Sequence, residues 1–289
     1  MTQVFSRGRI EALAAVALLV AACASGAPAT THPAPAVPTT VPSVAAPPAP
    51  SATPAGHVLH YVAFGDSWPG AGHCGGCKTF ADLWIRGLEA ATGATIEYTN
   101  FTGAHEPGAH GGGDSGTLLK VLRTDAQVRA GAAGADIILI ATGGNELRLV
   151  AGPLLGGTCG GTDGADCIRA LGKTWTTNFD AILSEIETLR GGKPTVIRLV
   201  SGANPFVSDP SMTDGLPKGF ATGNGALIFQ LLNDAMCSAA AKHHAVCVDV
   251  RPILNGPSMV APVDENSAES FQKVTDALNA SGVAELESQ

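Results

Sequence analysis

Basic and aromatic side chains are scarce in this sequence. Lysine and arginine together number 17 among 289 residues, against 25 aspartates and glutamates, so the formal net charge is −8 and aromatic residues make up 5%. Proteins that bind nucleic acid use clustered lysine and arginine to neutralise phosphates. The chain also lacks any apolar run of about 18 residues, the length that a membrane-spanning helix needs. These absences argue against a nucleic-acid-binding protein and a polytopic membrane protein.

Sequence motifs for metal, haem and phosphate binding are also missing. A Cys-x-x-Cys occurs at Cys74 and Cys77, but no second copy completes a zinc-binding set, and the haem order Cys-x-x-Cys-His is absent. The glycine run at 111–113 lacks the Lys-Ser/Thr ending of a phosphate-binding loop. We therefore expect no metal and no cofactor.

The N-terminus has the pattern of an export signal. Arg7 and Arg9 precede an apolar run over 12–22, which is too short for a transmembrane helix and is typical of a secretory signal peptide. The run ends in Val-Ala-Ala-Cys, which resembles the lipobox of bacterial lipoproteins. That resemblance implies that residues 1–22 are removed and that Cys23 is diacylated. The alternative is a plain secretory signal cleaved near residue 22.

A segment without charge follows the predicted lipid anchor. Residues 24–56 are mostly Ala, Pro, Thr and Ser, and they hold nine of the 19 prolines. Such a segment buries too little apolar surface to fold, and its prolines keep it extended. We interpret 23–56 as a lipidated stalk and 57–289 as one folded domain, held on the outer face of the cell membrane.

The other six cysteines fit an exported protein, in which disulfides persist. Six cysteines allow 15 connectivities. We favour pairing between neighbours, because each such pair encloses a short segment. The predicted disulfides are Cys74–Cys77, Cys159–Cys167 and Cys237–Cys247.

Strands and helices alternate along residues 57–289. The predicted strands are Val58–Phe64, Thr95–Phe101, Asp136–Thr142, Thr195–Val200 and Ala245–Val250. The predicted helices are Phe80–Ala91, Thr117–Ala130, Ile168–Leu189, Gly225–His243 and Glu269–Leu286. This order predicts an α/β fold with a doubly wound, mostly parallel five-stranded sheet flanked by helices. Sites in such sheets lie beyond the carboxyl ends of the strands.

Three loops at that edge carry polar motifs. The first strand runs into Gly65-Asp66-Ser67, the second ends in Asn100-Phe101-Thr102-Gly103, and the third ends in Thr142-Gly143-Gly144-Asn145-Glu146. A second Gly-Asp-Ser, at 113–115, follows glycines instead of a strand, so we interpret it as a turn and helix cap. Together the three loops resemble the SGNH (GDSL) family of esterases and lipases, and the resemblance covers nearly all of 57–289.

The resemblance implies a serine hydrolase. It makes Ser67 the nucleophile, and it builds an oxyanion hole from the backbone N–H groups of Ser67 and Gly103 and the side-chain amide of Asn145. Fixed donors of this kind stabilise the negative oxygen of an acyl-transfer intermediate. The implied substrate is an ester of a lipid or of an acylated glycan in the cell envelope, acted on by a monomer.

The sequence departs from the family where the family has Asp-x-x-His before the last helix. Here Asp264 is followed by Glu265, Asn266 and Ser267, and no histidine occurs after His244. Either carboxylate, Asp264 or Glu265, is a candidate base. Histidines of another loop are possible substitutes, chiefly His105 and His110, with His73 close after the nucleophile. A third alternative is an impaired site kept for binding. For the function itself, an acyltransferase on the same fold is a further alternative to a hydrolase.

The lipid anchor predicts a change in partitioning. Cys23→Ser removes the sulfur that carries the acyl chains, so the variant should move from the detergent phase to the aqueous phase in Triton X-114 extraction. Firm membrane attachment needs two or more such chains. A variant that partitions like the wild type would refute lipidation.

Overall fold

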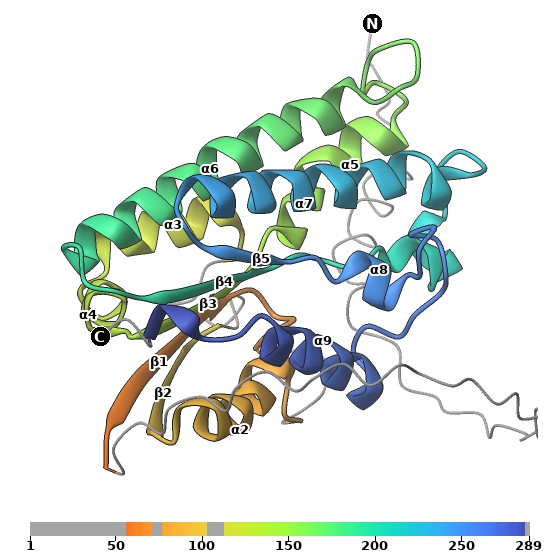
Figure 1. Ribbon diagram of the computed structural model, residues 1–289. Coiled ribbons are helices and arrows are strands. Elements are labelled where there is room, and N and C mark those ends of the chain that lie inside the picture. Colours follow the sequence, from red (N-terminus) through yellow and green to blue (C-terminus); the bar gives the residue numbers. More distant parts are fainter. Residues whose placement is uncertain (1–55, 71–76, 103–112, 287–289) are drawn as a thin grey trace, which may run out of the picture. The chain divides into compact units, whose positions relative to one another are not determined.

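The computed structural model describes residues 56–70, 77–102 and 113–286 (Figure 1). The predicted signal peptide and most of the predicted stalk lie outside these residues. So do several predicted functional or paired residues, namely Cys23, His73, Cys74, Gly103, His105 and His110.

A single parallel sheet forms the centre of the described domain. Its five strands follow the order β2-β1-β3-β4-β5, and every neighbouring pair is parallel. The predicted fold class is therefore confirmed. The strands are β1 (Val58–Gly65), β2 (Thr95–Phe101), β3 (Ile137–Ala141), β4 (Val196–Val200) and β5 (Val246–Val248). β3 is buried along its whole length, as expected of a central parallel strand covered on both faces.

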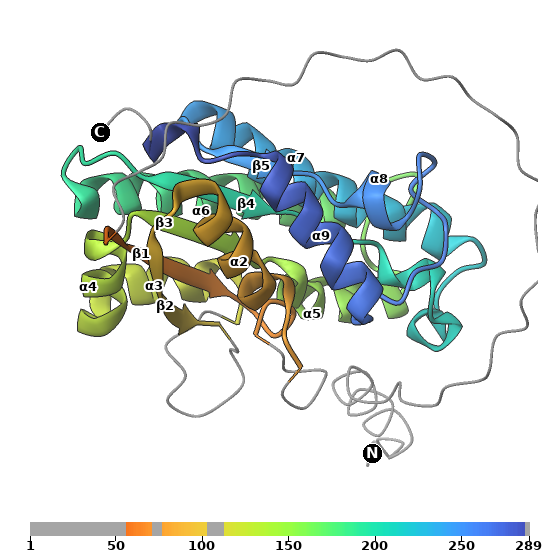
Figure 2. The ribbon, with the colours of Figure 1, turned by 60° about the horizontal axis from the view of Figure 1, so that its bottom comes forward.

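Helices cover both faces of the sheet (Figures 1 and 2). Alternate side chains of β1 point to opposite faces, so Val62 and Phe64 join one core while Tyr61 and Ala63 join the other. The first core is closed by α3 (Ser115–Thr124), α4 (Ala126–Gly134), α5 (Leu147–Leu155), α6 (Asp166–Arg190) and α7 (Asn224–Lys242). The second is closed by α2 (Phe80–Thr92), α8 (Arg251–Leu254) and α9 (Ala268–Ala280). No helix in the described ranges is long and apolar enough to cross a bilayer.

Two predicted helices were wrong in extent. The segment Thr117–Ala130 belongs to two helices, because the carboxylate of Asp125 accepts two backbone N–H groups of the following turn and so starts α4. The last predicted helix ends at Ala280 instead of Leu286, since Gly282 takes a left-handed φ of +70°. Helix α5 was not predicted at all.

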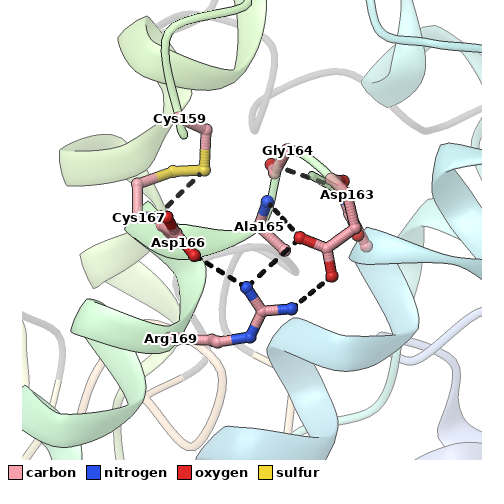
Figure 3. Close-up of a disulfide and its surroundings, with 8 residues drawn as sticks. Cys159, Asp163, Gly164, Ala165, Asp166, Cys167 and Arg169 are labelled. Carbon is pink, nitrogen blue, oxygen red and sulfur yellow. Dashed lines mark hydrogen bonds and ion pairs between the residues drawn. A yellow bond between two sulfur atoms is a disulfide. The ribbon is translucent and has the colours of Figure 1, made fainter. Parts of the chain in front are cut away.

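Two of the three predicted disulfides are confirmed. Cys159 pairs with Cys167, and Cys237 of α7 pairs with Cys247 of β5. Cys77 is also disulfide-bonded, while its predicted partner lies outside the described residues. Figure 3 shows the first disulfide beside Arg169, which forms ion pairs with Asp163 and Asp166 at the start of α6.

Candidate active site

The turn that carries Ser67 is pressed against the end of β3. The backbone N–H of Asp66 donates to the carbonyl of Ala141 at 3.1 Å. A Cβ atom on Gly65 would lie 2.3 Å from that carbonyl oxygen and 2.5 Å from the ring of Pro69. Position 65 therefore requires glycine, because any side chain would push the turn away from β3. Ser67 is half-buried in this turn, at the carboxyl edge of the sheet.

The buried carboxyl group of Asp66 joins this turn to the loop after β3. It accepts the backbone N–H of Trp68 at 3.0 Å and is also hydrogen-bonded by the backbone N–H of Gly144. Ser67 directly follows Asp66 and Asn145 directly follows Gly144, so the two residues stand on adjoining loops. Burial raises the pKa of Asp66 to about 6, although these hydrogen bonds act in the opposite direction.

The loop after β3 holds a buried donor without a partner. Asn145 lies in the short 3₁₀ turn Gly144–Glu146, and its Nδ2 atom is buried without a hydrogen bond in the described structure. Buried polar atoms are nearly always paired, so such a donor next to a serine turn indicates a place for an acceptor oxygen. The turn follows Gly143, whose φ is +121° and where a Cβ would lie 2.5 Å from a methyl carbon of Leu232.

Glu146 connects the loop after β3 to the start of α3. It is 2% exposed, and its Oε1 accepts the backbone N–H of Ser115 at 2.8 Å and also the Ser115 hydroxyl. The amide of Asn178 donates to that hydroxyl at 2.9 Å. Asp114 caps α3 by accepting the N–H of Thr117, so the second Gly-Asp-Ser is a helix start, as predicted. No pattern in the sequence indicated that Glu146 binds this helix start.

The loop before α9 reaches the serine turn through Glu265. The indole N–H of Trp68 donates to the backbone carbonyl of Glu265 at 3.1 Å. The Glu265 side chain is half-buried, and burial together with the charges of Asp66 and Asp264 raises its pKa to about 7. The influence of Asp66 places these two carboxyl groups near each other. Of the two carboxylates that the sequence offered as bases, Glu265 is therefore the one beside the serine turn.

Asp264 and Ser267, at the two ends of the segment that corresponds to the family's Asp-x-x-His, make hydrogen bonds near the start of α9. Asp264 is exposed, and its Oδ1 accepts the backbone N–H of Asn266 at 3.1 Å. Ser267, which stands at the family's histidine position, caps α9 by accepting the N–H of Ser270 at 3.1 Å. Both side chains therefore help to start the last helix.

No histidine in the described ranges stands at the carboxyl edge. His57 directly precedes β1 and His60 lies near its start, while His243 and His244 precede β5. All four are thus placed at the amino ends of strands. The described residues likewise contain no group of His, Cys, Asp and Glu that could hold a metal ion.

Known structures resemble this domain in fold. A lipase from a goat rumen metagenome matches with a TM-score of 0.58 and 18% identity, over 78% of this chain and 98% of the lipase. Phospholipase A1 from Streptomyces albidoflavus NA297 matches with a TM-score of 0.50 and 14% identity, over 77% and 98% of the two chains. No family model and no curated protein matches the sequence. The likeness shows the fold, an SGNH-like α/β sandwich.

Glu146→Gln should weaken the pH dependence of stability. Burial raises the pKa of Glu146 from 4.5 to about 7, so the folded state keeps a proton that the unfolded chain releases between those pH values. The free energy of unfolding therefore falls as pH rises through this range, and glutamine removes that loss. We expect the variant to gain on the order of 2 kcal/mol over the wild type between pH 5 and pH 8, measured by urea unfolding.

The exposed Glu89 of α2 provides the matched control. Glu89→Gln makes the same change on an exposed side chain and should follow the wild-type pH dependence. Equal slopes for Glu146→Gln and the wild type would show that Glu146 is ionised in the folded protein.

Proposed function

We propose that this protein is a serine hydrolase of carboxylic esters, with Ser67 as nucleophile, Asn145 as oxyanion donor and Glu265 as general base. The observation that supports it most directly is the buried Nδ2 of Asn145, which has no hydrogen-bond partner among the described residues. This donor stands on a loop that is hydrogen-bonded to the turn of Ser67 through Asp66 and Gly144. The similar solved structures include a lipase and a phospholipase, which agrees with ester hydrolysis.

The oxyanion hole follows from the chemistry of acyl transfer. When the Ser67 hydroxyl oxygen attacks the ester carbonyl, the carbonyl oxygen becomes negative and needs fixed donors. Nδ2 of Asn145 supplies one and the backbone N–H of Ser67 a second, with Gly103 as the predicted third. One such donor contributes on the order of 2.7–4 kcal/mol to the transition state.

Glu265 is proposed as the base because its pKa lies near neutrality. An ordinary glutamate is too weak a base to take a serine proton efficiently, whereas a pKa of about 7 matches the working pH. The proton of the Ser67 hydroxyl passes to the Glu265 carboxylate as the serine–acyl bond forms, and then to the departing alcohol. Asp66 and Glu265 repel each other when both are ionised, so their titrations are coupled.

The proposed substrates are esters of lipids or of acylated glycans in the cell envelope, within reach of an anchored enzyme. The second candidate function is that of a binding lipoprotein with an impaired site. It is favoured by the absence of a histidine from the carboxyl edge in the described structure. An acyltransferase would form the same acyl-serine and pass the acyl group to another alcohol, so product analysis separates it from a hydrolase.

Labelling with a fluorophosphonate tests the nucleophile and the oxyanion hole together. We expect the wild type to be labelled and Ser67→Ala to remain unlabelled. Asn145→Ala should react about 10²–10³-fold more slowly, because the phosphonyl oxygen loses a donor. Ser184→Ala, at an exposed position of α6, is the matched control and should label like the wild type. A folded wild type that takes up no label would favour the binding lipoprotein.

The pH profile tests the base. Because Glu265 must be ionised to accept a proton, p-nitrophenyl acetate turnover should rise with pH through about 7. Glu265→Gln should lower kcat at least about tenfold and abolish this rise. Asp264→Asn, which changes the exposed neighbouring carboxylate, should keep the maximal rate but move the rise to a lower pH, because it removes one of the charges that raise the pKa of Glu265. Unchanged rates in Glu265→Gln would move the assignment to His105 or His110.

A further inference from the structure

A cavity with a mixed polar and apolar lining lies at the carboxyl ends of β4 and β5, beside the proposed site. It has a volume of about 190 Å³ and is called the Arg251 cavity here. Arg251 begins α8, the short helix that follows β5 (Figure 1). Neighbouring strands are about 4.8 Å apart, so the end of β4 stands about 10 Å from the end of β1. Its lining includes Asn204, Ala226, Gln230, Arg251, Asn255 and Ser258.

Two buried asparagines make the walls of this cavity rigid. The backbone N–H of Asn204 donates to Oδ1 of Asn255 at 2.8 Å, and the Asn255 amide donates back to the Asn204 carbonyl at 3.2 Å. The Asn204 amide also donates to the carbonyl of Ala221 at 3.0 Å. Three loops are thereby fixed to one another, and the cavity is formed before any ligand enters.

One wall of the cavity continues into the proposed site. The Asn255 amide donates to the carbonyl of Ala261 at 3.0 Å, and the backbone N–H of Val263 donates to the Ser208 hydroxyl at 2.7 Å. The same loop reaches Glu265 two residues later. A ligand in the cavity is therefore held by the loop that carries the proposed base.

The free polar groups of the lining suit a neutral ligand rich in hydroxyl groups. Arg251 uses Nε and Nη2 to bind both oxygens of Asp249, at 3.1 and 3.0 Å, so its charge is balanced. Its Nη1, like the side chains of Gln230 and Ser258, makes no hydrogen bond to a described residue. Donors and acceptors thus remain available on several sides of the cavity.

Apolar side chains complete the lining. Phe229 and Met259 present carbon surface next to these polar groups. Pockets of this mixed character bind ligands that have an apolar face and a few polar groups to orient them. A sugar ring has such a face of C–H groups and a rim of hydroxyls. The volume equals that of about six water molecules, which one ring can replace.

We propose that the Arg251 cavity binds a sugar ring, which belongs to the alcohol part of an acylated glycan. As a statement about the substrate, this inference rests on the proposed function. It selects acylated glycans over simple lipid esters, since the ring sits beside the loop of Glu265 while the acyl group reacts at Ser67.

Binding of sugars that cannot react tests the cavity without any hydrolysis. The probes are the methyl glycosides of glucose, mannose, galactose and N-acetylglucosamine, measured by saturation-transfer NMR with the full chain. At least one should bind the wild type, and Ala226→Phe, which fills the cavity, should weaken it at least tenfold. Ala241→Phe makes the same change at an exposed position of α7 and should bind like the wild type.

Turnover then connects the cavity to the substrate. Ala226→Phe and Gln230→Ala should lower kcat/KM for the acetate ester of the bound glycoside at least tenfold relative to kcat/KM for p-nitrophenyl acetate. Ala241→Phe should leave this ratio unchanged.

The outcomes separate the two proposals. No glycoside binding, binding that survives Ala226→Phe, or binding of inorganic phosphate in place of sugars would overturn the sugar site. An unchanged turnover ratio in both cavity variants would overturn the substrate assignment. Glycoside binding that Ala226→Phe abolishes, in a protein that takes up no fluorophosphonate, would support the cavity while refuting hydrolysis.

Discussion

The contact between the turn after β1 and the loop after β3 is the constraint on which the proposed site depends. Two features create it. The absence of a side chain at Gly65 lets the turn approach the carbonyl of Ala141, and the buried carboxyl of Asp66 binds the backbone N–H of Gly144. Both loops follow adjacent parallel strands, so the sheet brings them to the same edge before any side chain acts. Without this contact, Ser67 and Asn145 would be two polar residues of separate loops.

The burial that makes this contact rigid also sets the electrostatics of the site. Asp66 and Glu265 lie near each other in a region that opposes ionisation, and their pKa values rise to about 6 and 7. As pH rises toward neutrality, Asp66 ionises before Glu265, so Glu265 stays partly protonated near pH 7. A glutamate in such surroundings becomes a useful base for a hydroxyl group. In the proposed function, this pair of carboxyls takes the acid–base role at an edge where none of the described histidines stands.

The sequence predicted the sheet well because buried parallel strands are continuous apolar runs with clear ends. The predicted Thr95–Phe101 coincides with β2, and the other strands differ only at their ends. Helix boundaries were harder to predict. The break at Asp125, for example, depends on a carboxylate that accepts backbone N–H groups of the following turn and so starts α4. For the site, the sequence offered the serine, the asparagine and two alternative carboxylates, each on its own loop. The sequence could not show whether Asp264 or Glu265 approaches the serine turn, because adjacent side chains point in different directions and tertiary packing decides between them.

The two Gly-Asp-Ser segments have different structural roles, because different elements precede them. The first follows a strand, so its serine is presented at the sheet edge. The second follows glycines and starts α3, where the backbone N–H of Ser115 donates to the carboxylate of Glu146. The longer side chain of glutamate lets Glu146 reach across to this second helix start. Glu146 and Asp66 hold the loop of Asn145 from opposite sides, so the second segment, which has no proposed part in the chemistry, fixes the geometry in which the first would act.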